Sequence, residues 1–131
     1  MERRTINPWT WQDSLGFVQA NECSGQQRML VCAGQAAVDA EGHPVHVGDM
    51  GAQMMQVVDN LETVLTQAGY SLSDVVRLNY YTTDVDAFFE SFGALVQRLT
   101  EAGCHPASTL LGVARLAYPE LLIEIEATAA R

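Results

Sequence analysis

The sequence contains no lysine, and this absence removes one kind of chemistry at once. Its seven basic residues are all arginines, so a covalent imine between a substrate and a lysine side chain is excluded. Sixteen acidic residues outnumber these arginines and give a formal net charge of −9. Nucleic acids and anionic membrane surfaces attract proteins of the opposite sign, so we expect neither as a partner.

Paired cysteines, long apolar runs and a signal-peptide pattern are also missing. The three cysteines form no CxxC pair, which indicates free thiols in a reducing cytoplasm. No apolar run is long enough to span a bilayer. His43 and His46 have no set of cysteine or histidine companions at ligand spacing, so we interpret them as exposed loop residues and expect no metal. GxSxG, GxGxxG and GxxxxGK motifs are absent, which removes the usual nucleophile-elbow and phosphate-binding signatures.

The pattern of apolar residues predicts one α+β domain over residues 1–131. Asp49 is a helix N-cap candidate, and Asp84 or Asp86 begins a second helix; Gly69 and Gly103 follow their ends. Cys32, Met50, Met54 and Met55 fit the core. Strands are expected at residues 1–11 (an edge strand or arm), 15–22, 28–35, 72–83, 107–116 and 121–129. We interpret the last two as a hairpin closed by the turn AYPE.

Two amphipathic helices cover only one face of a mixed sheet of about six strands. The other face needs a partner, and a second copy of the chain is the simplest one, so we expect an oligomer. Trp9 and Trp11 either line a pocket or fasten the N-terminal arm to the core, and we favour the second interpretation.

The stretch LLIEIEATAA carries two carboxylates on one face of a strand. Side chains alternate in an extended chain, so Glu124 and Glu126 point the same way while Ile123 and Ile125 point the other way. This face is either in water or partly buried between subunits. Burial raises the pKa of a carboxyl toward values that suit proton transfer, so at least one of the two is a functional candidate.

The segment HPASTLLGVARLAYPELLIEIEATAA, residues 105–130, resembles the C-terminal signature of the reactive-intermediate deaminase family, RidA/YjgF. Upstream, GFVQA, AGQ and the run from GDMGAQ to DVDAF follow in the family's order, so the resemblance covers about residues 17–129. It implies a chorismate-mutase-like homotrimer with a barrel-like centre, helices outside, and three small-molecule clefts between subunits.

The resemblance also implies an activity and a set of site residues. Active members hydrolyse enamines or imines of amino acids, such as 2-aminoacrylate, without metal or organic cofactor. An arginine of the family binds the substrate carboxylate there, and Ser108 stands at its position. A tyrosine, a serine, an asparagine and a cysteine of the family are replaced in the same way, by Phe17, Ala33, Phe92 and Leu110. Glu124 is the polar residue that is kept.

These replacements remove polar groups and favour an apolar or aromatic ligand over a carboxylate. Two interpretations remain open. In the first, the chain is a divergent hydrolase-like enzyme in which Glu124 transfers protons, Ser108 and Thr109 donate hydrogen bonds, and Phe17 and Phe92 form walls. Backbone N–H groups around Ala33 and Gly34 complete that site. In the second, the trimer binds a small apolar metabolite or a protein partner and catalyses nothing.

Overall fold

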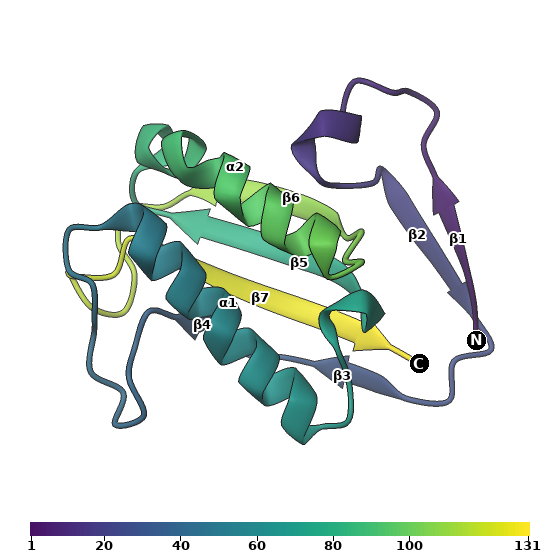
Figure 1. The fold of residues 1–131 in the computed structure, drawn as a ribbon, viewed down its shortest axis with the longest axis horizontal. Helices are drawn as coiled ribbons and strands as arrows, with labels where there is room; N and C mark the ends of the chain where they lie inside the picture. The colour runs from purple at the N-terminus through teal and green to yellow at the C-terminus, as the bar shows by residue number, and fades with distance from the viewer.

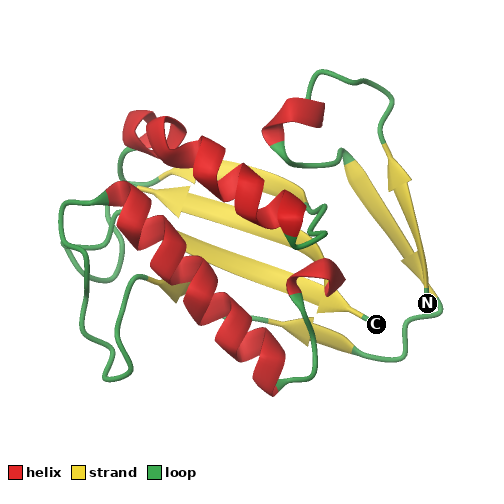
Figure 2. Cartoon of the chain, in the orientation of Figure 1, coloured by secondary structure: helices red, strands yellow, loops and turns green.

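A computed structural model describes the whole chain, residues 1–131. Two long helices lie side by side over one face of a sheet (Figure 1), and Figure 2 gives the same view by secondary structure. The strands are β1 (Glu2–Ile6), β2 (Ala20–Ser24), β3 (Met29–Val31), β4 (Gln35–Ala36), β5 (Val75–Thr82), β6 (Ala107–Gly112) and β7 (Ile123–Ala130). The helices are α1 (Met50–Gln67) and α2 (Val85–Glu101), with short 3-10 turns η1 (Asp13–Leu15) and η2 (Leu72–Asp74).

The main sheet has five strands in place of the expected six or so. Its order is β3–β7–β5–β6, and β4 pairs with β7 as well. β5 and β6 run parallel while the other pairs are antiparallel, so the sheet is mixed, as predicted. β1 and β2 form a separate antiparallel hairpin beside it (Figure 1), and the strand expected at 28–35 is divided into β3 and β4; together these two differences give the count of five. The α+β class with both helices on one face is confirmed.

The last two strands do not form the predicted hairpin, because β5 lies between them. Leu78 of β5 pairs with Ser108 of β6 on one side and with Ala127 of β7 on the other. α2 connects β5 to β6 as a crossover, which places β6 parallel to β5 and leaves the other edge of β5 for β7. Residues 113–122 then cross to β7, and the Thr82 hydroxyl donates to the Leu122 carbonyl at 2.7 Å where they arrive.

The buried side chain of Gln53 binds two distant loops to α1. Its Nε2 donates to the carbonyls of Val45 and His46, each at 3.3 Å, and to that of Glu120 at 2.8 Å. Its Oε1 accepts a hydrogen bond of 2.8 Å from the Leu122 N–H. Gln53 is fully buried, so these bonds satisfy an amide that would otherwise be costly to bury.

Local signals fix both helix starts as predicted. The Asp49 carboxylate accepts from the Ala52 N–H at 3.0 Å and begins α1. Asp84, the first of the two candidates, accepts from the Ala87 N–H at 3.0 Å and begins α2. These bonds satisfy N–H groups that have no partner inside the first helical turn. Gly69 follows α1 with a φ of 81°, the left-handed conformation that glycine adopts easily.

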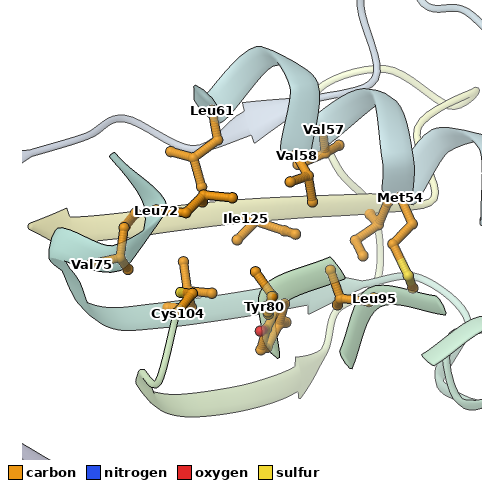
Figure 3. Packing of buried hydrophobic residues seen from close by; sticks show 14 of the residues in the cluster. Met54, Val57, Val58, Leu61, Leu72, Val75, Tyr80, Leu95, Cys104 and Ile125 are labelled. Carbon is orange, nitrogen blue, oxygen red and sulfur yellow. The ribbon is translucent and has the colours of Figure 1, made fainter. Parts of the chain in front are cut away.

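The core lies between the helices and the sheet (Figure 3). Val58 and Leu61 of α1 extend toward Ile125 of β7, and Met54 extends toward Leu95 of α2. All five side chains are at most 1% exposed. The larger buried cluster also includes Cys32, Met50 and Met54, as predicted, while Met55 packs against it partly buried. Neither helix is long and apolar enough to cross a membrane.

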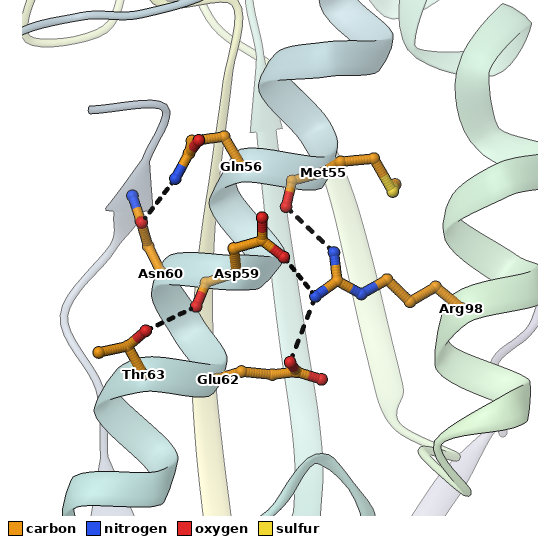
Figure 4. A network of polar contacts seen from close by, with 7 residues as sticks. All are labelled: Met55, Gln56, Asp59, Asn60, Glu62, Thr63 and Arg98. Carbon is orange, nitrogen blue, oxygen red and sulfur yellow. Dashed lines mark hydrogen bonds and ion pairs between the residues drawn. The ribbon is translucent and has the colours of Figure 1, made fainter. Parts of the chain in front are cut away.

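Arg98 joins the two helices on their outer side (Figure 4). From α2, its guanidinium donates to the Asp59 carboxylate at 2.6 Å, to Glu62 at 3.3 Å and to the Met55 carbonyl at 3.2 Å, all on α1. A guanidinium can bind several oxygens at once because its donors are arranged as a rigid fork. This contact therefore links α1 and α2 in addition to their shared core.

The N-terminal hairpin is fastened by Arg3. Its guanidinium donates to the carbonyls of Ser73 and Val75, each at 3.1 Å, and to that of His105 at 2.7 Å. Asn21 adds a 2.9 Å bond to the carbonyl of Val76. β1 and β2 are therefore tied to the end of the main sheet where β5 begins.

The two tryptophans do not have the fastening role that we favoured. Trp9 and Trp11 are 58% and 61% exposed. Trp11 packs edge-on against Phe17, with ring centroids 5.9 Å apart. The fully buried Gln12 holds the loop instead, because its Nε2 donates to the Trp9 carbonyl at 3.1 Å and its Oε1 accepts from Gln19 at 3.1 Å.

Candidate functional site

An apolar cavity of about 240 Å³ opens beside α2 and β6, on the helix side of the sheet. The rings of Phe88 and Phe92 lie 5.2 Å apart, and Phe89 packs edge-on against both. Ser108 contributes the single polar side chain other than the Tyr80 phenol, and no cation reaches the wall. The lining residues are Leu15, Phe17, Tyr80, Phe88, Phe89, Phe92, Ser108 and Leu110.

Four of the eight predicted site residues meet in this cavity: Phe17, Phe92, Ser108 and Leu110. They come from the loop after η1, from α2 and from β6. The loop is held in place because the Val18 N–H donates to the Pro106 carbonyl at 2.9 Å, just before β6. Gly16 allows its close approach to α2, since it has a φ of 74° and any Cβ there would lie 3.0 Å from Val96.

Glu124 lies on the opposite, helix-free face of the sheet. In β7 it is paired with Tyr81 of β5 and with Ala36 of β4, while its neighbour Ile125 is buried under the helices. Burial, followed by the negative charge of Glu126, raises the pKa of the Glu124 carboxyl. Both causes favour the protonated form of the carboxyl.

Ala33 and Gly34 stand beside Glu124, just before β4. A Cβ on Gly34 would lie 2.4 Å from Oε2 of Glu124, so the carboxylate rests against the Gly34 backbone. A glycine is needed where a side chain approaches the main chain this closely. The resemblance implied Gly34 and Glu124 for one site, and the two lie against each other in the structure, with Ala33 next in the chain.

Thr109 also lies on the helix-free face, but near the other edge of the sheet. Its hydroxyl accepts a hydrogen bond of 2.8 Å from Arg77. Strand β5 separates it from β7, so the predicted site residues fall into a cavity group, a Glu124 group and Thr109 alone. Within one chain, Glu124 does not line the cavity.

The sequence did not reveal the partners of Glu126. Tyr81 Oη donates to its carboxylate at 2.6 Å and Asn79 Nδ2 donates at 3.0 Å, both from β5. These two hydrogen bonds, Tyr81 first, lower the pKa of Glu126. The alternation in LLIEIEATAA indicated that Glu124 and Glu126 share one strand face with a possible function. Which residues lie opposite Glu126 depends on strand order and register, which the alternation does not give.

The remaining candidates do not form a metal centre. His43 lies in an exposed loop with its Nδ1 3.8 Å from the Asp39 carboxylate. No group of three or more histidine, cysteine, aspartate or glutamate side chains is arranged to hold a metal ion.

Comparison with known proteins gives consistent results over most of the chain. A family model described as "Endoribonuclease L-PSP" matches residues 14–131. A RutC family protein of Pyrococcus horikoshii is 35% identical over 76% of this chain and 77% of its own. The 2-iminobutanoate/2-iminopropanoate deaminase of Escherichia coli is 31% identical over 79% of this chain and 80% of its own. The crystal structure of YyfB from Yersinia pestis, from the Rid protein family, is 42% identical, with a TM-score of 0.90 and full coverage of both chains.

Proposed function

Because the chain belongs to the RidA/YjgF family, we propose that it hydrolyses imines or enamines of small, uncharged aromatic compounds. The observation that carries the proposal is the position of the Glu124 carboxyl, which lies against the Gly34 backbone on the helix-free face, where burial and the charge of Glu126 raise its pKa. A carboxyl in this state can give a proton to an imine nitrogen and take one from water. A purely structural carboxylate would be held by hydrogen bonds, as Glu126 is.

The cleft of the proposal forms between copies of the chain. One copy supplies the apolar cavity with Phe17, Phe92 and Ser108, and a neighbouring copy supplies Glu124 with the backbone at Gly34. The helix-free face supports this arrangement, since Met29 and Val31 are 63% and 71% exposed there. Exposed apolar side chains on a sheet face that has no helices favour contact with another subunit. We propose a homotrimer, as the resemblance implied.

The reaction needs water and no cofactor. The oxygen of a water molecule bonds to the imine carbon, while Glu124 gives its proton to the nitrogen and the C=N bond becomes a single bond. The bound water oxygen passes one of its protons to the Glu124 carboxylate, which leaves a neutral carbinolamine. Glu124 then protonates the amino nitrogen, the C–N bond breaks as ammonia leaves, and the hydroxyl proton passes back to Glu124 as the carbonyl forms. The products are an aldehyde or ketone and ammonia, and Glu124 is protonated again for the next cycle.

The lining of the cavity sets the preferred substrate. The E. coli relative is named for 2-iminobutanoate and 2-iminopropanoate, both of which carry a carboxylate. The cavity of this chain has no arginine or lysine in its wall, so a carboxylate there would lose its hydration without gaining a partner. Phenyl rings pack well against the edges of Phe88, Phe89 and Phe92. Endoribonuclease activity fits less well, because the net charge of −9 repels RNA.

An imine decay assay tests the proposal. Phenethylamine and a flavin amine oxidase generate an uncharged aromatic imine in situ, and the release of ammonia after a pulse of oxidation reports its hydrolysis. We expect the wild-type chain to accelerate ammonia release, Glu124→Gln to abolish the effect, and Glu101→Gln, a loss of the same charge on α2, to retain it. The same assay with 2-aminoacrylate should give little acceleration. If Glu124→Gln remains fully active, the proposal is wrong.

The non-catalytic interpretation has its own signature in the same experiment. A protein that only binds would be stabilised against heat by a neutral aromatic compound such as phenylacetaldehyde oxime, yet would leave imine decay at the background rate. Light scattering tests the assembly separately, and we expect three times the 14.3 kDa mass of one chain.

A further inference from the structure

The helix-free face holds two carboxyls of the same kind in different surroundings. Glu126 accepts two hydrogen bonds from β5, at 2.6 Å from Tyr81 Oη and 3.0 Å from Asn79 Nδ2. The shorter one has the length of an O–H···O⁻ bond to a charged acceptor. Glu124, two residues earlier on the same strand, owes its pKa to burial and to Glu126 alone. The strand therefore carries one bound carboxylate and one free carboxyl.

The amide of Asn79 is oriented for Glu126 at a cost to itself. Its Oδ1 is buried and has no hydrogen-bond partner. Rotating the amide by half a turn would point this oxygen at the Glu126 carboxylate and lose the 3.0 Å bond from Nδ2. A buried carbonyl without a partner is unfavourable, so donation to Glu126 is what fixes this orientation. The site is built to keep Glu126 charged.

The charge of Glu126 acts on Glu124 across one repeat of the strand. Residues two apart lie about 7 Å from each other on the same face. An anion at this range disfavours a second negative charge, so the neighbour retains its proton more strongly. Arg77 and Tyr81 of β5 are the other titratable groups on this side, and Arg77 further lowers the pKa of Glu126. On the β4 side, Ala36 and Gly34 contribute no charge.

We propose that Glu126 is a positioning residue for Glu124: Tyr81 and Asn79 stabilise its charged form through two hydrogen bonds, and this charge, together with burial, favours the protonated form of Glu124. The catalytic consequence rests on the proposed function, since it makes Glu124 a better acid at the start of the cycle. Tyr81 and Asn79 become part of the site without touching a substrate.

Carboxyl NMR of the intact protein, labelled at glutamate Cδ, tests this proposal. In the wild type we expect Glu126 to titrate at a lower pH than Glu124. Glu126→Gln should move the Glu124 midpoint to lower pH, and Tyr81→Phe should move the Glu126 midpoint upward, toward that of Glu124. The control Glu101→Gln removes one charge from the end of α2 and should move neither midpoint.

Two results would overturn the inference. One is an unchanged Glu124 midpoint in Glu126→Gln, and the other is a wild type in which Glu126 titrates above Glu124. Tyr81→Phe keeps the ring in place and decides the matter if Glu126→Gln does not fold. The pH dependence of turnover provides a second readout, because Glu126→Gln should shift the loss of activity at high pH to lower pH.

The titration is independent of turnover, so the two proposals can fail separately. Coupled midpoints together with full activity of Glu124→Gln would remove the catalytic role and leave the charge relation intact. Loss of activity in Glu124→Gln together with uncoupled midpoints would remove Glu126 from the site and leave Glu124 as the catalytic residue.

Discussion

Replacing Gly34 with alanine adds a methyl group where the Glu124 side chain now lies. The new carbon would be 2.4 Å from Oε2, 2.7 Å from Cδ and 2.9 Å from Cγ of Glu124. Comfortable contact begins near 3.5 Å, so the carboxylate has to move by about 1 Å. Gly34 has no positive φ, and alanine therefore fits its backbone without strain. The change displaces one functional group and leaves the main chain as it is.

The effects on stability and on activity are expected to differ strongly. Moving Glu124 to a poorer rotamer costs about 0.5–1.5 kcal/mol. The lower flexibility of the unfolded chain gives back about 0.4–1 kcal/mol, so the free energy of unfolding should change by less than about 1 kcal/mol. A misplacement of 1 Å can lower a rate by about 100-fold, equivalent to about 2.7 kcal/mol in the barrier. Turnover should therefore fall about 100-fold in a folded protein.

The measurement combines urea unfolding with the imine decay assay. Gly93→Ala is the matched control, because a Cβ at this position of α2 meets nothing within 4 Å. This variant should keep its activity and gain about 0.5–1 kcal/mol, since alanine is the better helix residue. Full activity of Gly34→Ala at unchanged stability would refute the reasoning, because the reacting carboxyl would then not be where Glu124 lies.

Three further outcomes follow from the structure. Phe88→Ala should lower the free energy of unfolding by about 3–5 kcal/mol in urea, because the ring is 1% exposed; a loss below 1 kcal/mol would contradict this packing. Glu124→Gln should be more stable than the wild type at neutral pH: the raised pKa of folded Glu124 means that wild-type stability is lost as pH rises through it. That difference should vanish in thermal melts below the ordinary glutamate pKa, and a gain that persists there would be inconsistent. Arg3→Ala should speed amide hydrogen exchange in β1 and β2 and leave β7 unaffected, because Arg3 binds the hairpin to the main sheet. Unchanged exchange in β1 and β2 would show that other contacts hold the hairpin.

Features that depend on neighbours in the sequence could be predicted well. Asp49 and Asp84 cap helices through N–H groups three residues away, so their signals are complete in a short stretch. The burial of Met54 and the alternation of Ile123 and Ile125 with Glu124 also follow from periodicity alone. The α+β class was confirmed because these local patterns add up to a definite order of strands and helices.

Features that depend on strand order could not be predicted in the same way. The hairpin of the last two strands was wrong because a turn-like sequence does not tell which strand lies between its ends. The helix predicted after residue 84 was the correct signal. A strand, a helix and a strand in succession favour a parallel pair of strands joined by a crossover, as β5, α2 and β6 form. The bonds from Tyr81 and Asn79 to Glu126 required the register of β5 on β7 as well.

The residues of the candidate site remain a prediction, and their arrangement in space could not be derived from the sequence. Phe17, Phe92 and Ser108 meet in one cavity, and Gly34 meets Glu124, although the residues of each group are far apart in the sequence. Nothing in a strand pattern states that the two groups lie on opposite faces of one sheet. The pairing with β5 shows it: Ser108 lies opposite Leu78, which is buried under the helices, whereas Glu124 lies opposite Tyr81, which is only half-buried.

Gln53 has a consequence for the motion of the molecule. One side-chain amide binds both the loop at Val45 and His46 and the segment at Glu120 and Leu122. If Gln53 moves with one of these segments as it opens, its hydrogen bonds to the other segment break. The two segments are more than seventy residues apart, yet we expect them to open together, because both are bound by Gln53 in the first turn of α1. The second segment leads directly into β7. We therefore expect opening of the first loop to destabilise the start of the strand that carries both glutamates.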